Sequence, residues 1–300
     1  MRSTIRSRWI HLLVLAVACL LSTAAAAHPG SGIVVDRLGQ VYFVDMVSGV
    51  WKLDPRGALT HRPGPAFHWM ALDADDRFRA AKLPSGSSWE LARIGTNPTL
   101  LLASDFPIAM GQDANLYHPS QGGGTPLRLL KLLPSGRTSI QATLPARGAH
   151  GPLLYLNGLA AGPDGSLYYT EDDAIRRVSR EGRVSTVVEK IAVAGCRSIP
   201  GKSAQERPLL RGLDVDAGGT VYVTATGCFS VLKVTPAGKV SILPQVPSPW
   251  APTGVALFGN DLYVLEFQNG DSDDRREMVP RVRKIAPDGK TVILATVTRH

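Results

Sequence analysis

Four ionisable side chains have the types and positions that catalysis would require. Asp45, Glu171 and Glu266 each stand three residues after a tyrosine, at the end of a predicted strand, and His68 precedes another strand. Carboxylates and imidazoles serve as general bases and acids, and carboxylates also bind metal ions. The sequence therefore offers His68, Glu171 and Glu266 as catalytic candidates and Asp45 as a ligand-binding candidate. The alternative is that the carboxylates cap strand ends or pair with arginines, and that His68 is packed or solvated.

A second set of residues occupies the position just before a recurring short strand. Its members are Ser31, Phe67, Phe106, Asn157, Arg211 and Thr253. Asn157, Arg211 and Thr253 can hydrogen-bond to a ligand, and the guanidinium of Arg211 can hold an anionic group through two parallel bonds. A buried guanidinium is costly unless it is paired. We therefore expect Arg211 to form an ion pair with Glu171 or Glu266.

These residues are positioned by a motif that recurs along the chain. The clearest copy runs over residues 157–188 and reads as four short strands, with turns at 163–165 and 180–182. Proline presets φ for such a turn and glycine accepts its positive-φ position, while β-branched and aromatic residues favour the strands between. One aromatic residue marks the second strand of each copy: Tyr42, Phe78, Tyr117, Tyr168, Tyr222 and Tyr263.

Six copies of a four-stranded unit predict an all-β fold, a six-bladed β-propeller with four antiparallel strands per blade. The marker residues recur 36 to 54 residues apart, which is typical of propeller blades and not of helical solenoids. We expect residues 28–300 to form this single domain. Each copy supplies its own four strands, so blade six should abut blade one without exchanging a strand.

The connections between strands differ by face. Turns between strands one and two, and between strands three and four, are short, and in an up-and-down sheet both lie on one face, the short-turn face. The long connections span residues 118–126, 146–156, 192–210 and 268–280 and belong to the opposite, long-loop face. Insertions on one face of a rigid scaffold commonly build a binding surface for a small molecule or a protein. They could also be tolerated ornaments.

The repeated pattern G-hydrophobic-x-x-D-x-x-G-x-hydrophobic-Tyr, followed by V-x-K-hydrophobic-x-P-x-G, resembles the NHL-repeat and gluconolactonase (senescence-marker-protein) propellers. The resemblance implies a divalent metal, calcium or zinc, at the channel mouth, held by a first-blade glutamate, asparagines and an aspartate. Asn157 matches an asparagine ligand. Ser31 and Arg211 stand at the positions of the two carboxylates. An arginine repels a cation, so we expect no metal or other cofactor, with calcium or zinc as the alternative.

The N-terminus predicts export. Arg2, Arg6 and Arg8 precede an apolar run over residues 10–21 and the small residues of STAAAA, the pattern of a signal peptide over residues 1–27 that is cleaved after Ala27. The run is shorter than the roughly 20 residues of a membrane span. A lipid anchor on Cys19 is the remaining alternative. The product would be periplasmic or secreted, with no transmembrane anchor.

Charge and cysteine content limit the partners further. Removal of residues 1–27 takes three arginines from a chain of net charge +8, which leaves +5 and no long basic run. We therefore expect no nucleic-acid partner and a monomer. Cys196 and Cys228 remain, and an even count in an exported chain favours a disulfide over two buried thiols. Both fall on the long-loop side of blade five.

Two functions are compatible with these observations. The first is an exported propeller that binds a small ligand or a protein on its long-loop face without catalysis. The second is a metal-assisted lactone or ester hydrolase, or a lyase, that acts at the channel mouth. The loss of both carboxylate positions favours the first function, and the polar residues kept at the mouth support the second.

Overall fold

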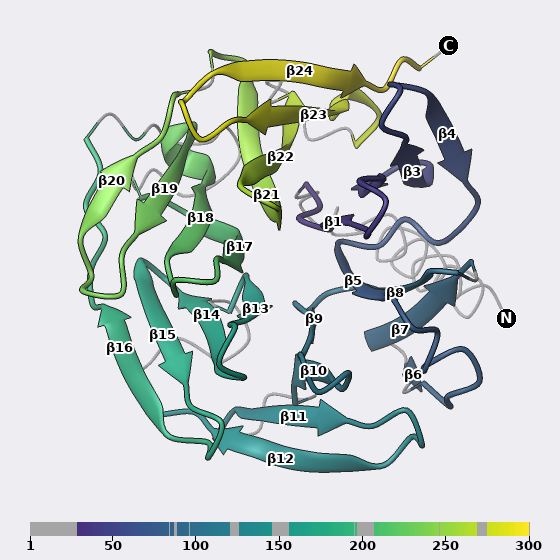
Figure 1. The fold of residues 1–300 in the computed structure, drawn as a ribbon, viewed down its shortest axis with the longest axis vertical. Helices are drawn as coiled ribbons and strands as arrows, with labels where there is room; N and C mark the ends of the chain where they lie inside the picture. The colour runs from purple at the N-terminus through teal and green to yellow at the C-terminus, as the bar shows by residue number, and fades with distance from the viewer. Residues whose placement is uncertain are drawn as a thin grey trace, which may run out of the picture.

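The computed structural model describes residues 29–83, 85–86, 89–95, 97–120, 126–145, 156–194, 196, 207–245, 247–268 and 275–299. It contains six four-stranded antiparallel sheets arranged around a central axis, with the first strand of each sheet innermost (Figure 1). The predicted all-β, six-bladed propeller is confirmed. The predicted signal peptide lies outside the described residues. Within the part of the chain that is described, no helix has the length and apolar character of a membrane span.

The first three blades contain the following strands. Blade one has β1 (Ile33–Val35), β2 (Val41–Asp45), β3 (Gly49–Leu53) and β4 (Leu59–Arg62). Blade two has β5 (Trp69–Asp73), β6 (Ser85–Gly86), β7 (Trp89–Ile94) and β8 (Thr99–Ala103). Blade three has β9 (Ala109–Met110), β10 (Leu116–Pro119), β11 (Arg128–Leu132) and β12 (Thr138–Thr143).

The last three blades repeat the arrangement. Blade four has β13 (Leu159–Ala161), β14 (Leu167–Glu171), β15 (Ala174–Val178) and β16 (Val184–Val188). Blade five has β17 (Leu210–Val215), β18 (Val221–Ala225), β19 (Ser230–Val234) and β20 (Val240–Ile242), with the 3-10 helix η1 (Thr226–Cys228). Blade six has β21 (Trp250–Phe258), β22 (Asp261–Gln268), β23 (Pro280–Ile285) and β24 (Thr291–Thr296), with η2 (Arg275–Glu277).

Blade two departs from the simple up-and-down order. Its strands lie in the order β5-β8-β7-β6, so the chain leaves the innermost strand, crosses to the outer edge and returns inward. The prediction that Phe78 marks the second strand is wrong, because this residue lies in the crossing segment. There it is fully buried, and its backbone N–H donates to Asp73 Oδ2 at 2.7 Å. The second strand is β8, which pairs with β5 from Trp69 and Ala103 to Asp73 and Thr99.

The marker tyrosines of the other five blades each pair with a basic residue of the third strand. The cross-strand pairs are Tyr42–Lys52, Tyr117–Lys131, Tyr168–Arg177, Tyr222–Lys233 and Tyr263–Lys284. In four of them the cation lies 5.8 to 6.0 Å from the ring centroid. Such contacts stabilise a pair by about 0.5–1 kcal/mol at exposed sites. The basic position of the sequence motif is therefore explained by packing on the tyrosine.

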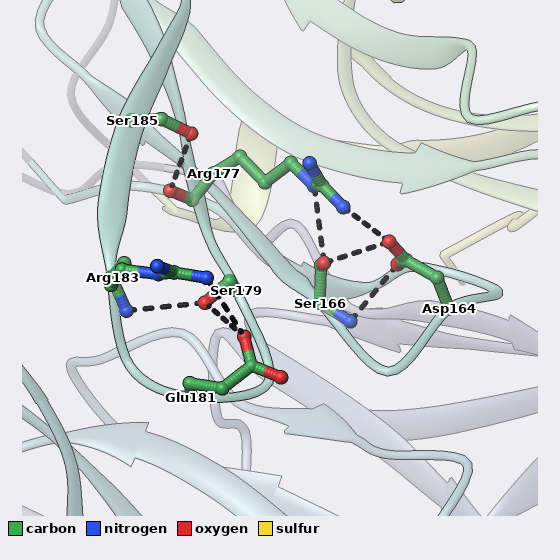
Figure 2. A network of polar contacts seen from close by, with 7 residues as sticks. All are labelled: Asp164, Ser166, Arg177, Ser179, Glu181, Arg183 and Ser185. Carbon is green, nitrogen blue, oxygen red and sulfur yellow. Dashed lines mark hydrogen bonds and ion pairs between the residues drawn. The ribbon is translucent and has the colours of Figure 1, made fainter.

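An aspartate also organises the short turn of blade four (Figure 2). Asp164 accepts hydrogen bonds from the backbone N–H and the hydroxyl of Ser166, both at 3.0 Å, and forms an ion pair with Arg177 of β15. Arg177 also donates to the hydroxyl of Ser166 at 3.1 Å. The turn between the first two strands is thus tied to the third strand. In blades one and five the aspartate of the motif, Asp36 or Asp216, accepts two backbone N–H groups of its turn.

Blades six and one meet without exchanging a strand, as predicted, since each sheet is made of four consecutive strands. Thr253 Oγ1 of β21 donates to the carbonyl of Gly30 at 2.7 Å. A Cβ atom on Gly254 would lie 2.2 Å from the carbonyl oxygen of Ser31, so only glycine permits this close approach. Buried Phe43, Val282 and Leu265 belong to one apolar cluster that spans this junction. The core therefore lies between the blades, and it includes the closing junction.

Candidate functional site at the channel mouth

Of the residues predicted to surround the channel mouth, Asn157, Arg211, Thr253 and Ser31 follow one another from blade to blade around the axis. The first strands of the blades, which contain or follow these residues, form the innermost ring (Figure 1). A Cβ atom on Gly158 would lie 2.2 Å from the carbonyl oxygen of Arg211, and one on Gly212 would lie 2.9 Å from the carbonyl oxygen of Thr253. The glycines let neighbouring inner strands approach closely. The preceding residues, including Asn157, are consequently gathered at one end of the channel.

Arg211 crosses the mouth and binds a backbone carbonyl. Its Nη1 donates to the carbonyl oxygen of Pro29 at 2.9 Å, on the segment that leads into blade one. The side chain keeps some exposure, yet the surrounding protein desolvates it and lowers its pKa to about 10. Among the described residues no carboxylate lies within ion-pair distance of it. The expected ion pair with Glu171 or Glu266 is therefore not formed.

The three carboxylates of the second strands pair with other arginines. Glu171 Oε2 accepts from Arg176 Nε at 2.9 Å, and Glu266 accepts from Arg281 at 2.7 Å and from Arg283 at 2.5 Å. Asp45, whose side chain is buried, accepts from Arg299 at 2.5 Å. The alternative interpretation of these carboxylates, that they pair with arginines, agrees with the observed contacts. Neither Glu171 nor Glu266 presents an unpaired carboxylate in the arrangement that a general base requires.

The Asp45–Arg299 pair ties the C-terminus to blade one and allows a direct test. Arg299 also donates to the carbonyl of Met278 at 3.1 Å, while Asp45 keeps hydrogen bonds from Ser48 Oγ at 2.6 Å and Val47 N–H at 3.1 Å. Arg299→Met should lower the free energy of unfolding by about 1–3 kcal/mol, because a buried carboxylate loses its charged partner. Urea unfolding measures this. Arg56→Met, at an exposed turn, is the control, and an equal effect of both substitutions would contradict the assignment.

Two buried histidines lie near the same end of blades two and three. His68 Nδ1 contacts the carbonyl oxygen of Ser104 and lies 3.7 Å from Asp105 Oδ1. His118, which the sequence reasoning missed, donates from Nδ1 to the carbonyl of Pro119 at 2.9 Å. A carbonyl only accepts, so the proton resides on Nδ1 and neutral His118 has an unprotonated Nε2. Burial lowers the pKa of His118 and favours this neutral form.

The remaining candidates contact backbone. Trp69 Nε1 of blade two donates to the carbonyl of Asn157 in blade four at 3.3 Å, so the indole spans the mouth past blade three. Asn157 is half-buried. Thr253 is fully buried, and its hydroxyl binds the carbonyl of Gly30. Asn157 and Arg211 therefore keep partly exposed side chains, and Thr253 serves the junction between blades six and one.

The residues at the mouth do not fit a divalent metal. Ser31 offers one buried hydroxyl without a hydrogen-bond partner among the described residues, and Arg211 places a guanidinium at the second carboxylate position. Calcium prefers six to eight oxygen ligands that include carboxylates, and the described residues contain no group of three or more His, Cys, Asp or Glu arranged to hold a metal ion. Asn157 alone matches the expected ligand set.

The cysteines are joined as predicted. Cys196, in the connection from β16 to β17, forms a disulfide with Cys228 of η1. Both side chains are buried in the apolar cluster of blade five. The bridge fixes one of the long connections to the end of its blade on the long-loop face.

The fold and the mouth define a protein of the six-bladed β-propeller class. Solved structures similar to it include a luciferin-regenerating enzyme (16% identity, 90% of this chain and 94% of that chain, TM-score 0.52). They also include a gluconolactonase from Xanthomonas campestris (14%, 78% and 81%, 0.52) and virginiamycin B lyase from Staphylococcus aureus (16%, 91% and 85%, 0.51). At these identities the likeness shows the fold alone. No protein-family model and no curated protein matches the sequence.

Proposed function

We propose that this protein is an exported binding propeller whose channel mouth takes a carboxylate-bearing small molecule, or a protein partner that presents a carboxylate. The observation that carries the proposal is the environment of Arg211. The Arg211 side chain is partly exposed, but the surrounding protein removes enough of its hydration to lower its pKa to about 10. Its described hydrogen bond goes to a neutral carbonyl. Export rests on the N-terminal pattern, with which the Cys196–Cys228 disulfide is compatible.

A desolvated guanidinium with a neutral partner favours an anionic ligand. Hydrogen bonds between charged groups are about twice as strong as neutral ones, and a carboxylate matches the two parallel donors of arginine. Neutral sugars would gain no such bond. Half-buried Asn157 precedes the inner strand next to that of Arg211, and Trp69 Nε1 donates to its carbonyl. The mouth thus offers a positive charge and, at the neighbouring blade, a half-buried amide.

The second candidate, a hydrolase or lyase, is supported by the buried histidines. Neutral His118 could accept a proton at Nε2, and several propellers of similar fold are enzymes by name, among them a gluconolactonase and virginiamycin B lyase. Against it, His68 is 6% exposed and His118 is 1% exposed, so a substrate would need a rearrangement to reach them. Turnover of a lactone that is lost in His118→Ala but retained in Arg211→Gln would favour this candidate.

Calorimetry with gluconate, lactate and glucose tests the binding proposal. Wild type should bind the hydroxy acids in preference to glucose, and Arg211→Gln should weaken hydroxy-acid binding by about 10- to 100-fold, the effect of one charged hydrogen-bond donor. Arg56→Gln is the matched control, since Arg56 is exposed on a short turn. Equal affinity of wild type and Arg211→Gln for the acids would overturn the proposal, as would tight calcium binding by wild type that Arg211→Asp abolishes.

A further inference from the structure

A cavity of 390 Å³ occupies the channel below the mouth. Its walls come from the inner strands of all six blades, and they include the strand ends next to the short turns but none of the mouth residues. The volume lies within the range of about 300–1,000 Å³ that is usual for small-molecule sites. The cavity is therefore separate from the Arg211 site and opens towards the short-turn face.

The cavity is lined mostly by apolar side chains, and one lining residue is a carboxylate. Valine, leucine, isoleucine, alanine and methionine make up most of the walls, Gln112 is polar, and of the described residues lining it only Asp214 can ionise. Burial raises the pKa of Asp214 to about 6, against two backbone hydrogen bonds that lower it; Asp216, in the following turn, raises it slightly. Arg211, three residues earlier on β17, forms no ion pair with it among the described contacts.

Comparison of the blades shows that Asp214 breaks the repeat. In five blades one inner-strand residue pairs directly with the marker tyrosine, and these residues are Val34, Ala109, Ala160, Asp214 and Ala256. Blade two has no marker tyrosine in its second strand, and there Ala71 of β5 lines the cavity. The fold therefore accepts a small apolar side chain at this level of every other blade. A carboxylate here is not required by blade geometry.

The carboxylate of Asp214 is held in a fixed position. Its Oδ1 accepts from the N–H of Val215 at 2.8 Å, and its Oδ2 accepts from the N–H of Leu257 in blade six at 2.7 Å. Each oxygen retains a further lone pair for a ligand. The inner edges of the six first strands have no neighbouring strand across the axis, so backbone carbonyls add further acceptors. One fixed negative charge among apolar walls is complementary to a cation that carries an apolar body.

We propose that this cavity is a second binding site and that it takes a primary organic ammonium ion, with its N–H groups bound to Asp214 and its hydrocarbon part against the inner strands. A divalent metal would need several carboxylates and is not the matching ligand. An ammonium donates three hydrogen bonds, and its charge offsets that of the partly buried carboxylate. Binding should therefore strengthen as Asp214 ionises.

Calorimetry with n-hexylammonium, with n-hexanol as its neutral analogue, tests the site. Asp214→Asn should weaken hexylammonium binding by about 10- to 100-fold and leave hexanol binding unchanged, because only the charge is removed. Asp216→Asn is the matched control, since Asp216 lies outside the cavity lining and accepts turn N–H groups of Gly218 and Thr220. Arg211→Gln should also leave hexylammonium binding unchanged, which separates this site from the mouth.

Wild type alone provides a second measurement that needs no variant. Hexylammonium should bind about tenfold more weakly at pH 5 than at pH 8, because protonation of Asp214 competes with the ligand. Circular dichroism at both pH values verifies that the protein is folded. No binding of hexylammonium at millimolar concentration, equal binding at both pH values, equal binding by Asp214→Asn, or loss of binding in Arg211→Gln would each overturn the proposal.

Discussion

Replacement of Glu266 by alanine should lower the free energy of unfolding by about 3–5 kcal/mol, the range measured when one partner of a buried ion pair is removed. The Glu266 side chain is fully buried and binds two guanidiniums, those of Arg281 and Arg283, which are 11% and 5% exposed. Its removal would leave two buried positive charges close together. Arg281 also lies 3.9 Å above the ring of Trp250, so its position is fixed by packing as well as by charge.

The experiment is urea unfolding of wild type, Glu266→Ala and a matched surface variant, Asp261→Ala. Asp261 pairs with Lys284 at 3.1 Å on the same blade, but both side chains are about one third exposed. Exposed pairs contribute about 0–1 kcal/mol, so this control should change the midpoint little. A Glu266→Ala protein as stable as wild type would show that the two arginines can reach solvent or other partners, and that the pair does not hold blade six together.

The second large effect concerns the disulfide. Removal of the Cys196–Cys228 bridge by the double substitution Cys196→Ala and Cys228→Ala should cost about 3–4 kcal/mol, because the bridge spans 32 residues and restricts the unfolded chain. The affected connection leads directly into β17, which carries both Arg211 and Asp214. Urea unfolding with and without reductant gives the value.

Reductant should destabilise wild type by a similar amount and leave the double variant unchanged. Alanine is preferable to serine because both cysteines are buried in an apolar cluster, where a hydroxyl would require a partner. Thiol titration of the unfolded, unreduced protein should find neither cysteine free. Two reactive thiols, or an unfolding midpoint of wild type that does not respond to reductant, would contradict the bridge.

The sequence by itself determined the architecture, because the signals are local and repeated. Turn residues, strand residues and the marker tyrosine recur in register, and each copy must stack on others to bury its two faces. The same logic predicted the gathering of Asn157 and Arg211 at one end of the channel, the abutment of blades six and one, and the disulfide.

Blade two is where the local signal was weakest. Phe78 took the place of the marker tyrosine in sequence, but tertiary packing put it in the crossing segment and gave the second-strand position to β8.

Only the tertiary structure decided which charges meet. Strand register decides that Glu171 pairs with Arg176, and that Glu266 pairs with Arg281 and Arg283. The path of the C-terminal segment decides that Asp45 pairs with Arg299. Arg211 is left with a backbone carbonyl for the same reason. The pKa of Asp214 is raised because surrounding protein removes water from its carboxylate, and the cavity that it lines is formed by inner strands from all six blades. Periodicity specifies the fold, whereas the electrostatics of a site depend on distances between residues far apart in the chain.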